Sequence, residues 1–258
     1  MYCIFGSSGG KKGRGKTTIL LLMSVVFFVL FAGQIDAQKK FSKIYPAGDS
    51  VRLELVNKTG TVTVIGWNRP EISITAILEA PAAVVIPQSL SGKILINLVR
   101  DNSGRGEIGN VNFTIRVPNN LSVDIETVIG NLNISNINGS LVRAHVSSEG
   151  DIMLTNISAT RVMAENITGD ILFDGDLHGG GIYQFSSMKG TISIRIPIPS
   201  NFKLVATAPS TRSINLGAFN GGAMRPLGNG RRIVGQAGDG SASMMVTNQQ
   251  GTIQFLQR

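Results

Sequence analysis

The middle of the chain repeats about every twenty residues, and this period constrains the fold more than any other feature. Three apolar series keep the spacing: Leu132, Ile152 and Leu172; Ile137, Ile157 and Leu177; and Val142, Val162 and Ile182. Each period holds two short stretches of alternating apolar and polar residues, a pattern typical of strands with one buried face. Because one such unit cannot bury its apolar face alone, the repeat predicts an all-β solenoid with coils of about twenty residues.

Alternating stretches also occur outside the repeat, as in VRLELV, TVTVIGW and EISITAIL after residue 50. The chain has 31 glycines for tight turns, whereas aromatic residues make up 6% and charged residues 16%. This composition is too apolar for a disordered chain and too glycine-rich for a helical bundle. We therefore expect one β-domain over residues 38–258, with the glycine-rich stretch 219–240 as an exposed loop.

Residues 1–37 have the order of a targeting segment. A basic region, residues 1–18, precedes the uncharged run ILLLMSVVFFVLFA, and Ala37 suits a cleavage site. Residues 19–37 thus predict a signal peptide or, if uncleaved, a membrane-anchor helix. In both cases residues 38–258 are extracytoplasmic, in the periplasm, at the cell surface or secreted, and the membrane is contacted only through residues 19–37 if they stay uncleaved.

Two features near the N-terminus suggest chemistry that the rest of the chain does not support. Residues 10–17 match the phosphate-loop pattern GxxxxGK[ST], but the segment that follows is apolar on every face and no alternation of strands and helices comes after it. The one cysteine, Cys3, precedes the apolar run, so the β-domain can form neither a disulfide nor a thiolate metal site. We expect no cofactor.

Part of the positive charge belongs to the targeting region, and the rest gives little support for a nucleic-acid partner. The net charge is +8, and residues 1–37 hold four of the 24 basic and one of the 16 acidic residues, which leaves +5 for residues 38–258. Beyond residue 37 no basic run is longer than a pair such as Arg231 and Arg232, so we expect no nucleic-acid partner. Attraction to acidic glycans stays open.

Several strings resemble one family of bacterial exported proteins, the "putative adhesin" domain family. They are GTVTVIGWNRPEISIT at residues 60–75, the repeated GDIxLxNI and SSxxGTISIRIP, and GTIQF at residues 251–255. The resemblance covers residues 41–258 and implies a right-handed parallel β-helix. The family is functionally uncharacterised, so the resemblance implies fold better than function and transfers no catalytic residue.

The densest polar cluster of the chain is GDILFDGDLHGGG, with Asp170, Asp174, Asp176 and His178. Such residues on one side of a β-helix could bind Ca²⁺ or act as paired carboxylates on a polysaccharide. Asp-Gly and His-Gly are also ordinary turn residues, and we favour a turn between coils. The other histidine, His145, fits packing or surface exposure better than metal binding.

We therefore expect a non-enzymatic cell-envelope module for adhesion or surface scaffolding, with a cell-surface or polysaccharide ligand. The alternative is a polysaccharide-binding protein, or a polysaccharide lyase or hydrolase, that uses the acidic cluster. Trp67 fits a cap at the apolar end of the stack, with sugar stacking as its alternative.

Overall fold

The computed structural model describes residues 1–2, 6, 38–48, 51–221 and 223–258. The chain divides into two units between Ala37 and Gln38, and every strand and helix described below belongs to the second unit. The signal or anchor segment predicted at residues 19–37 and the phosphate-loop pattern at 10–17 lie outside the described residues.

The second unit is all-β, as predicted, and its strands are short. In chain order they are β1 (Lys39–Pro46), β2 (Arg52–Thr59), β3 (Val62–Trp67), β4 (Glu71–Leu78), β5 (Gln88–Leu90), β6 (Lys93–Asn97), β7 (Val111–Pro118), β8 (Ser122–Ile129), β9 (Leu132–Ile137), β10 (Leu141–Glu149), β11 (Ile152–Ile157), β12 (Arg161–Thr168), β13 (Ile171–Gly175), β14 (Ile182–Lys189), β15 (Thr191–Ile196), β16 (Phe202–Thr207), β17 (Ile214–Asn215), β18 (Arg225–Leu227), β19 (Arg232–Ala237), β20 (Ala242–Asn248) and β21 (Thr252–Gln257). The helical segments are α2 (Leu98–Asp101) and η1 (Gly217–Phe219). Among the described residues, no helix has the length and apolar character needed to cross a membrane.

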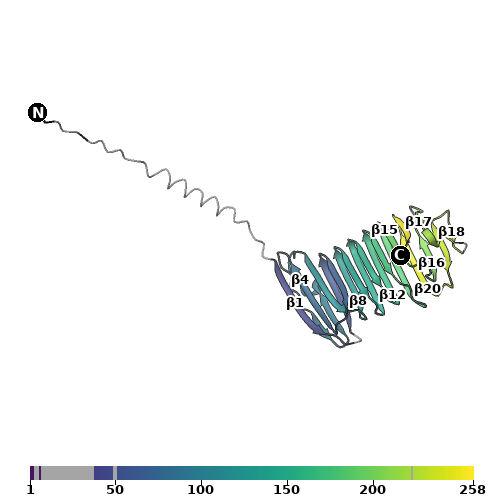
Figure 1. The fold of residues 1–258 in the computed structure, drawn as a ribbon, viewed down its shortest axis with the longest axis horizontal. Coiled ribbons are helices and arrows are strands. Elements are labelled where there is room, and N and C mark those ends of the chain that lie inside the picture. The colour runs from purple at the N-terminus through teal and green to yellow at the C-terminus, as the bar shows by residue number, and fades with distance from the viewer. Residues whose placement is uncertain (3–5, 7–37, 49–50, 222) are drawn as a thin grey trace. The chain divides into compact units, whose positions relative to one another are not determined.

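The strands form two large sheets (Figure 1). Sheet A has the order β1-β4-β7-β3-β9-β11-β13-β15-β21-β17, and sheet B has the order β18-β19-β16-β20-β14-β12-β10-β8-β2-β6-β5. From β8 to β15 the chain alternates between the sheets, and each strand pairs in parallel with the next strand of its own sheet. One strand from each sheet therefore makes one repeat, and successive repeats lie side by side.

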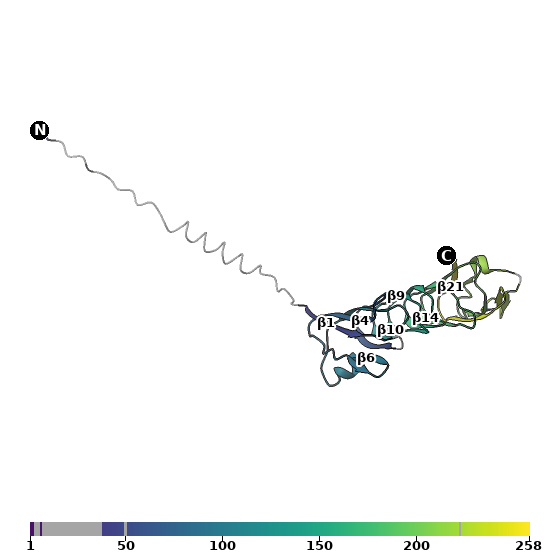
Figure 2. The same cartoon turned by 60° about the horizontal axis from the view of Figure 1, so that its bottom comes forward.

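The core lies between the two sheets, which face each other (Figure 2). Alternate residues of a strand point inward: in β10, Val142 and Val146 are fully buried, while Arg143 points outward and is partly exposed. Aromatic rings from opposite sheets meet in this core, as Phe173 and Phe185 do with ring centroids 5.1 Å apart. The alternation that predicted strands thus also builds the packed interior.

In each of the three predicted apolar series, the strand register pairs a different residue at the third position. The paired residues are Leu132, Ile152 and Ile171; Ile137, Ile157 and Gly175; and Val142, Val162 and Tyr183. The predicted third members Leu172, Leu177 and Ile182 are not buried. The reason is that the repeat length varies: nineteen residues separate the turn glycines Gly150 and Gly169, and the next interval is twenty-one.

Where sheet B leads into sheet A, each repeat turns through a glycine, and we call this turn the glycine corner. The stacked residues are Gly60, Gly130, Gly150, Gly169, Gly190 and Gly251. Gly169 has φ +131°, and a Cβ placed on it would lie 2.3 Å from the carbonyl oxygen of Gly150. Both the backbone conformation and the close approach of neighbouring repeats therefore require glycine here.

Where sheet A leads back into sheet B, the chain turns through residues 138–140, 158–160 and 176–181, which we call the open corner. Just before it, Asn136 and Asn156 adopt φ values of +60° and +53°. The side-chain Nδ2 of Asn156 donates a hydrogen bond of 2.8 Å to Oδ1 of Asn136. Asparagine tolerates this left-handed conformation, and its amide also links one repeat to the next.

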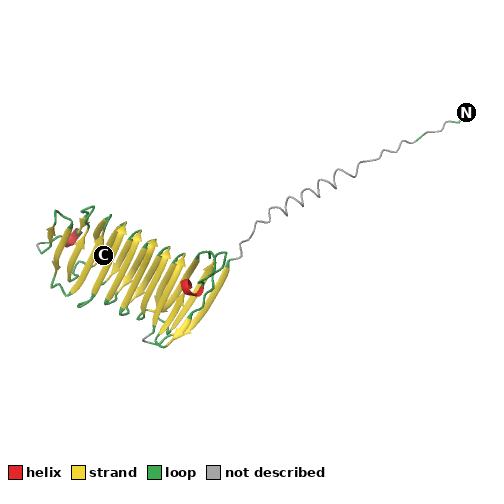
Figure 3. Ribbon diagram, turned by 180° about the vertical axis from the view of Figure 1, so that it is seen from behind, coloured by secondary structure: helices red, strands yellow, loops and turns green. Residues whose placement is uncertain are grey.

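Both ends of the second unit depart from the repeat by adding antiparallel strands (Figure 3). At one end β1, β4 and β7 pair antiparallel, as do β5 and β6; at the other, β19 pairs with both β16 and β18. The loop predicted at residues 219–240 is therefore wrong in part, because it contains strands β18 and β19. Its side chains are mostly exposed, and these strands carry no strict alternation that would have marked them.

Candidate functional site

The structure separates the four residues of the predicted acidic cluster. Asp170 lies at the glycine corner, where its Oδ1 accepts a 2.7 Å hydrogen bond from the amide of Thr191 in the next repeat. The amide of Asp170 in turn donates to Oδ1 of Asp151, and the amide of Asp151 donates to Oδ1 of Asn131. Asp170 is thus one member of a ladder that links four repeats at their turns.

Asp174 and Asp176 lie at the other end of β13 and are paired with arginines. Asp174 is 7% exposed, and its Oδ2 lies 2.6 Å from Nη2 of Arg195. The C-terminal residue Arg258 bridges both carboxylates, with Nε 3.3 Å from Asp174 Oδ1 and Nη1 2.9 Å from Asp176 Oδ1. The contact with Asp174 Oδ1 is an ion pair without hydrogen-bond geometry. These contacts tie the residue after β21 to the end of β13.

His178 closes the longest turn of the open corner. Its Nε2 lies 2.8 Å from the carbonyl oxygen of Ser158 and 2.9 Å from the Ser158 hydroxyl. The amide of His178 donates to the hydroxyl of Tyr183, and that hydroxyl donates to the carbonyl oxygen of Ala159. Burial raises the pKa of the Tyr183 phenol, and the hydrogen bond from His178 partly offsets this.

The remaining sequence candidates also have structural partners. His145 in β10 has Nδ1 3.5 Å from Oε2 of Glu165 in β12. Trp67 ends β3, a strand that lies between β7 and β9 and not at the edge of the sheet, so its expected role as a cap at the end of the stack is wrong. Its Nε1 donates to the carbonyl oxygen of Glu71, and the guanidinium of Arg69 lies 5.1 Å from its ring centroid. Within the part of the chain that the structure describes, no three His, Cys, Asp or Glu side chains gather as a metal site would require.

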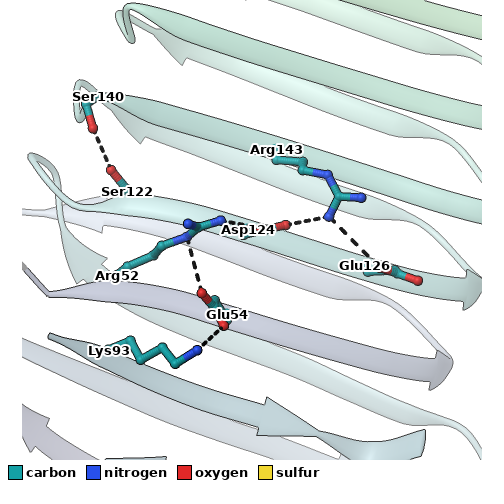
Figure 4. A network of polar contacts seen from close by, with 8 residues as sticks. All are labelled: Arg52, Glu54, Lys93, Ser122, Asp124, Glu126, Ser140 and Arg143. Carbon is teal, nitrogen blue, oxygen red and sulfur yellow. Dashed lines mark hydrogen bonds and ion pairs between the residues drawn. The ribbon is translucent and has the colours of Figure 1, made fainter. Parts of the chain in front are cut away.

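The outer face of sheet B carries a charged network that sequence reasoning missed (Figure 4). Asp124 in β8 is bonded to Arg52 in β2 and to Arg143 in β10, the latter at 2.9 Å. Glu54 accepts a 2.9 Å hydrogen bond from Lys93. The hydrogen bond to Asp124 raises the pKa of Arg143. The hydrogen-bonded partners of this network are 19 to 72 residues apart, so no local motif indicates it.

Beside this network, at the open corner, lies a groove of about 840 Å³, which we call the corner groove. Its polar lining comes from Arg52, Asn120, Ser122, Ser140, Thr160 and Arg161, and its apolar lining includes Val51, Leu141 and Ile182. A smaller pocket of about 250 Å³ beside Trp67 shares Asn120 with the corner groove. The hydroxyls of Ser122 and Ser140 face each other (Figure 4), and their oxygens lie 2.9 Å apart. The sequence signal was a small polar residue just before or at the start of successive sheet B strands.

The outer face of sheet A is different, because a central row of side chains crosses all ten strands without a charge. In strand order this row is Ser42, Thr75, Thr114, Thr63, Asn133, Met153, Leu172, Ser193, Gln254 and Asn215. None of the ten is buried. At about 4.8 Å between strands, the row extends over about 43 Å. We call it the uncharged row.

Comparisons with known proteins support the fold only. The sequence matches no family model, and no curated protein matches it. Among solved structures, it resembles a "putative cell adhesion protein" from Clostridium sporogenes with a TM-score of 0.50 and 14% identity, over 86% of this chain and 100% of that one. A "putative adhesin" from Bacteroides fragilis aligns with a TM-score of 0.44 and 13% identity, over 86% and 99% of the two chains. At such identities the likeness carries no function from one protein to the other.

Proposed function

We propose that residues 38–258 form a right-handed parallel β-helix of the "putative adhesin" kind, and that the protein is an exported, non-enzymatic module for adhesion or surface scaffolding. The alternation of the chain between two parallel sheets supports the β-helix, and right-handed crossovers are the rule when parallel strands of one sheet are connected. The description of the similar structure from Clostridium sporogenes, a "putative cell adhesion protein", agrees with an adhesive role.

The uncharged row on sheet A is the observation that carries this proposal. The row itself offers hydroxyls, amides and two apolar side chains, Met153 and Leu172, and none of its members carries a charge that contact would desolvate. Charged residues, among them Arg116, Asp174 and Arg195, flank the row on the same face. Binding through such a surface gains from repetition, because each strand adds a similar small contact. Adhesion therefore needs no single tuned residue.

The contacts of the acidic cluster favour a non-enzymatic role over polysaccharide cleavage. Cleavage of a glycosidic bond needs two carboxyl groups that face the same bond at a set separation. Asp174 and Asp176 are instead paired with Arg258, and Asp170 accepts a hydrogen bond from a neighbouring amide. A lyase or hydrolase thus remains the alternative, and it would have to release these aspartates from their partners.

Export is the part of the proposal that rests on the sequence alone. The basic and apolar segments before residue 38 support a signal peptide or an anchor, and hence an extracytoplasmic β-domain. Protease treatment of intact, expressing cells tests this, with fractionation as the second measurement. We expect the β-domain in the envelope or the medium, and a wholly cytoplasmic protein would contradict export.

Adhesion is tested with bacteria that express the full chain, compared with cells that carry an empty vector. Attachment to glass and to polysaccharide-coated and protein-coated surfaces is counted under flow. We expect expression to increase attachment, and Met153→Lys and Ser193→Lys in the uncharged row to reduce it. Gln184→Lys, on the outer face of sheet B, is the matched control. Attachment that does not depend on expression would contradict the proposal.

The enzymatic alternative has a separate test. Purified protein is incubated with neutral and acidic polysaccharides, and reducing ends and unsaturated products are measured. We expect neither product. Turnover that disappears in folded Asp174→Asn and Asp176→Asn variants would make the alternative correct.

A further inference from the structure

We infer that the corner groove binds an extended polysaccharide that carries carboxylate groups, such as a chain of uronic acids. The inference rests on the proposed adhesive function, to which it adds a ligand class and a site. This site is separate from the uncharged row, because it lies at the open corner beside sheet B.

The shape of the groove favours an extended ligand. Residues at the starts of five neighbouring sheet B strands line it: β2, β8, β10, β12 and β14. At about 4.8 Å between strands, these five strands span about 19 Å. A sugar unit in an extended polysaccharide has a length similar to one strand spacing. A linear chain laid across the strands would therefore meet equivalent positions of successive repeats.

The lining has the mixed character that a sugar requires. Ser122, Ser140 and Thr160 supply one hydroxyl each from three successive repeats. Thr160 already donates a 3.0 Å hydrogen bond to the carbonyl oxygen of Ser140, which leaves its oxygen lone pairs to accept from a ligand. Leu141 and Ile182 lie between or beside these groups and offer apolar contact to the C–H faces of sugar rings.

The charge of the groove selects an acidic ligand. The charged residues among its described lining are Arg52 and Arg161, and both are cations. Arg52 is bonded to Asp124 and lies 3.6 Å from Glu54, so its charge is largely compensated. Arg161 is exposed and forms no ion pair with any carboxylate of the described residues.

Arg161 also has a suitable position and geometry. It starts β12, with Leu141 and Ile182 as its neighbours across the sheet. An arginine fork can bond both oxygens of one carboxylate, which a lysine ammonium cannot match. Arg161 is therefore the residue that we expect to hold a uronate, while the hydroxyls on either side bond to the sugar ring.

The test is binding of polygalacturonate fragments to protein purified from the envelope of expressing cells, measured by calorimetry or interferometry. We expect saturable binding that weakens as salt increases, and much weaker binding to a neutral glucan of equal length. Arg161→Gln should lower the affinity by about tenfold or more, because it removes charged hydrogen bonds. Arg161→Lys should lose part of this affinity.

The matched control is Arg231→Gln, which removes the same charge from an exposed arginine outside the groove. An equal loss in this control would mean attraction to net charge and would overturn the inference, as would binding that Arg161→Gln leaves unchanged. Displacement by a short DNA duplex as readily as by galacturonate oligomers would also overturn it. If polygalacturonate does not bind but cells that express the protein still attach, the proposed ligand site is wrong and the adhesive function stands. If the cells do not attach but Arg161-dependent binding is observed, the ligand site stands and the adhesive function is wrong.

Discussion

The two corners of each repeat both carry the chain from one sheet to the other, but they do so with different kinds of turn. At the glycine corner the chain needs one or two residues between β10 and β11, β12 and β13, or β14 and β15, and neighbouring repeats touch through their backbones. At the open corner the turn grows from three residues to six, and side chains line a groove. One corner fixes the spacing of the stack, and the other accepts variation in length and chemistry.

This difference indicates where a repeated fold can acquire a ligand site. The glycine of the first kind of turn offers only backbone groups, and these already bond to the next repeat, as the amide of Gly150 does to Thr168. The side chains of Asp151 and Asp170, next to these glycines, are likewise used in bonds between repeats. The open corner leaves its side chains free to change while the sheets stay in register. The site that we propose lies at the second kind of turn.

The largest expected effect compares a buried and an exposed residue next to the open corner. Ile157 ends β11 just before this corner and is fully buried, so Ile157→Asp should prevent folding or cost more than about 4 kcal/mol. Asn156→Ala, one residue earlier and exposed, should cost about 1 to 2 kcal/mol, through its lost amide bond and the left-handed backbone that alanine tolerates less well than asparagine. Chemical denaturation measures both. Equal losses would mean that the assigned register is wrong.

The next effect compares the two corners directly through one added methyl group. In Gly169→Ala the new Cβ would meet the carbonyl of Gly150 at 2.3 Å, so we expect a loss of about 3 kcal/mol or more. Gly180→Ala at the open corner has φ +75° but no atom within 4 Å of its Cβ, and should cost about 1 kcal/mol. Similar melting temperatures for the two variants would contradict the contrast between the corners.

The sequence predicted the repeated part of the molecule better than its ends. A period of twenty residues marked the strands of both sheets from β9 to β15, because buried columns demand regular spacing. It did not reveal the intervals of nineteen and twenty-one, which shift Leu172 out of the core. The end strands β1, β4 and β19 pair antiparallel outside the repeat, so the twenty-residue period could not indicate them. Of these, β4 was marked by its own alternation, EISITAIL.

The candidate sites were predicted less well, for a related reason. The acidic cluster was the alternative site, beside the favoured turn, because its residues are close in sequence. The structure places Asp170 at one end of β13 and Asp174 at the other. The corner groove shows the opposite: Arg52 and Arg161 are 109 positions apart in the sequence, and they line one groove only because the strands stack. A site built across repeats has to be found by register, not by motif.

A smaller effect concerns the pairing that ties the end of the chain to sheet A. Asp174→Asn should cost about 1 kcal/mol, because the carboxylate is buried but both partner arginines are partly exposed to solvent. Removal of Arg258 should have a similar cost that is not additive with Asp174→Asn, since both changes break one shared contact. Denaturation of the single and double variants measures this coupling. Full additivity would mean that the contact contributes nothing.

The smallest expected effect depends on pH and concerns Tyr183, which is hydrogen-bonded to residues of the open corner. Burial raises the pKa of Tyr183 in the folded protein. The folded state thus holds the phenol proton more tightly than the unfolded state, whose pKa is about 10. The resulting stability is fully present below pH 10 and is lost as the pH rises through the folded pKa. Tyr183→Phe should cost about 1 kcal/mol at pH 8, through its bonds to His178 and Ala159, and the difference from the parent should shrink above pH 10. Chemical denaturation of both proteins at pH 8 and above pH 10 measures this. If the stability difference between Tyr183→Phe and the parent is the same at both, the pKa of the phenol does not change on folding.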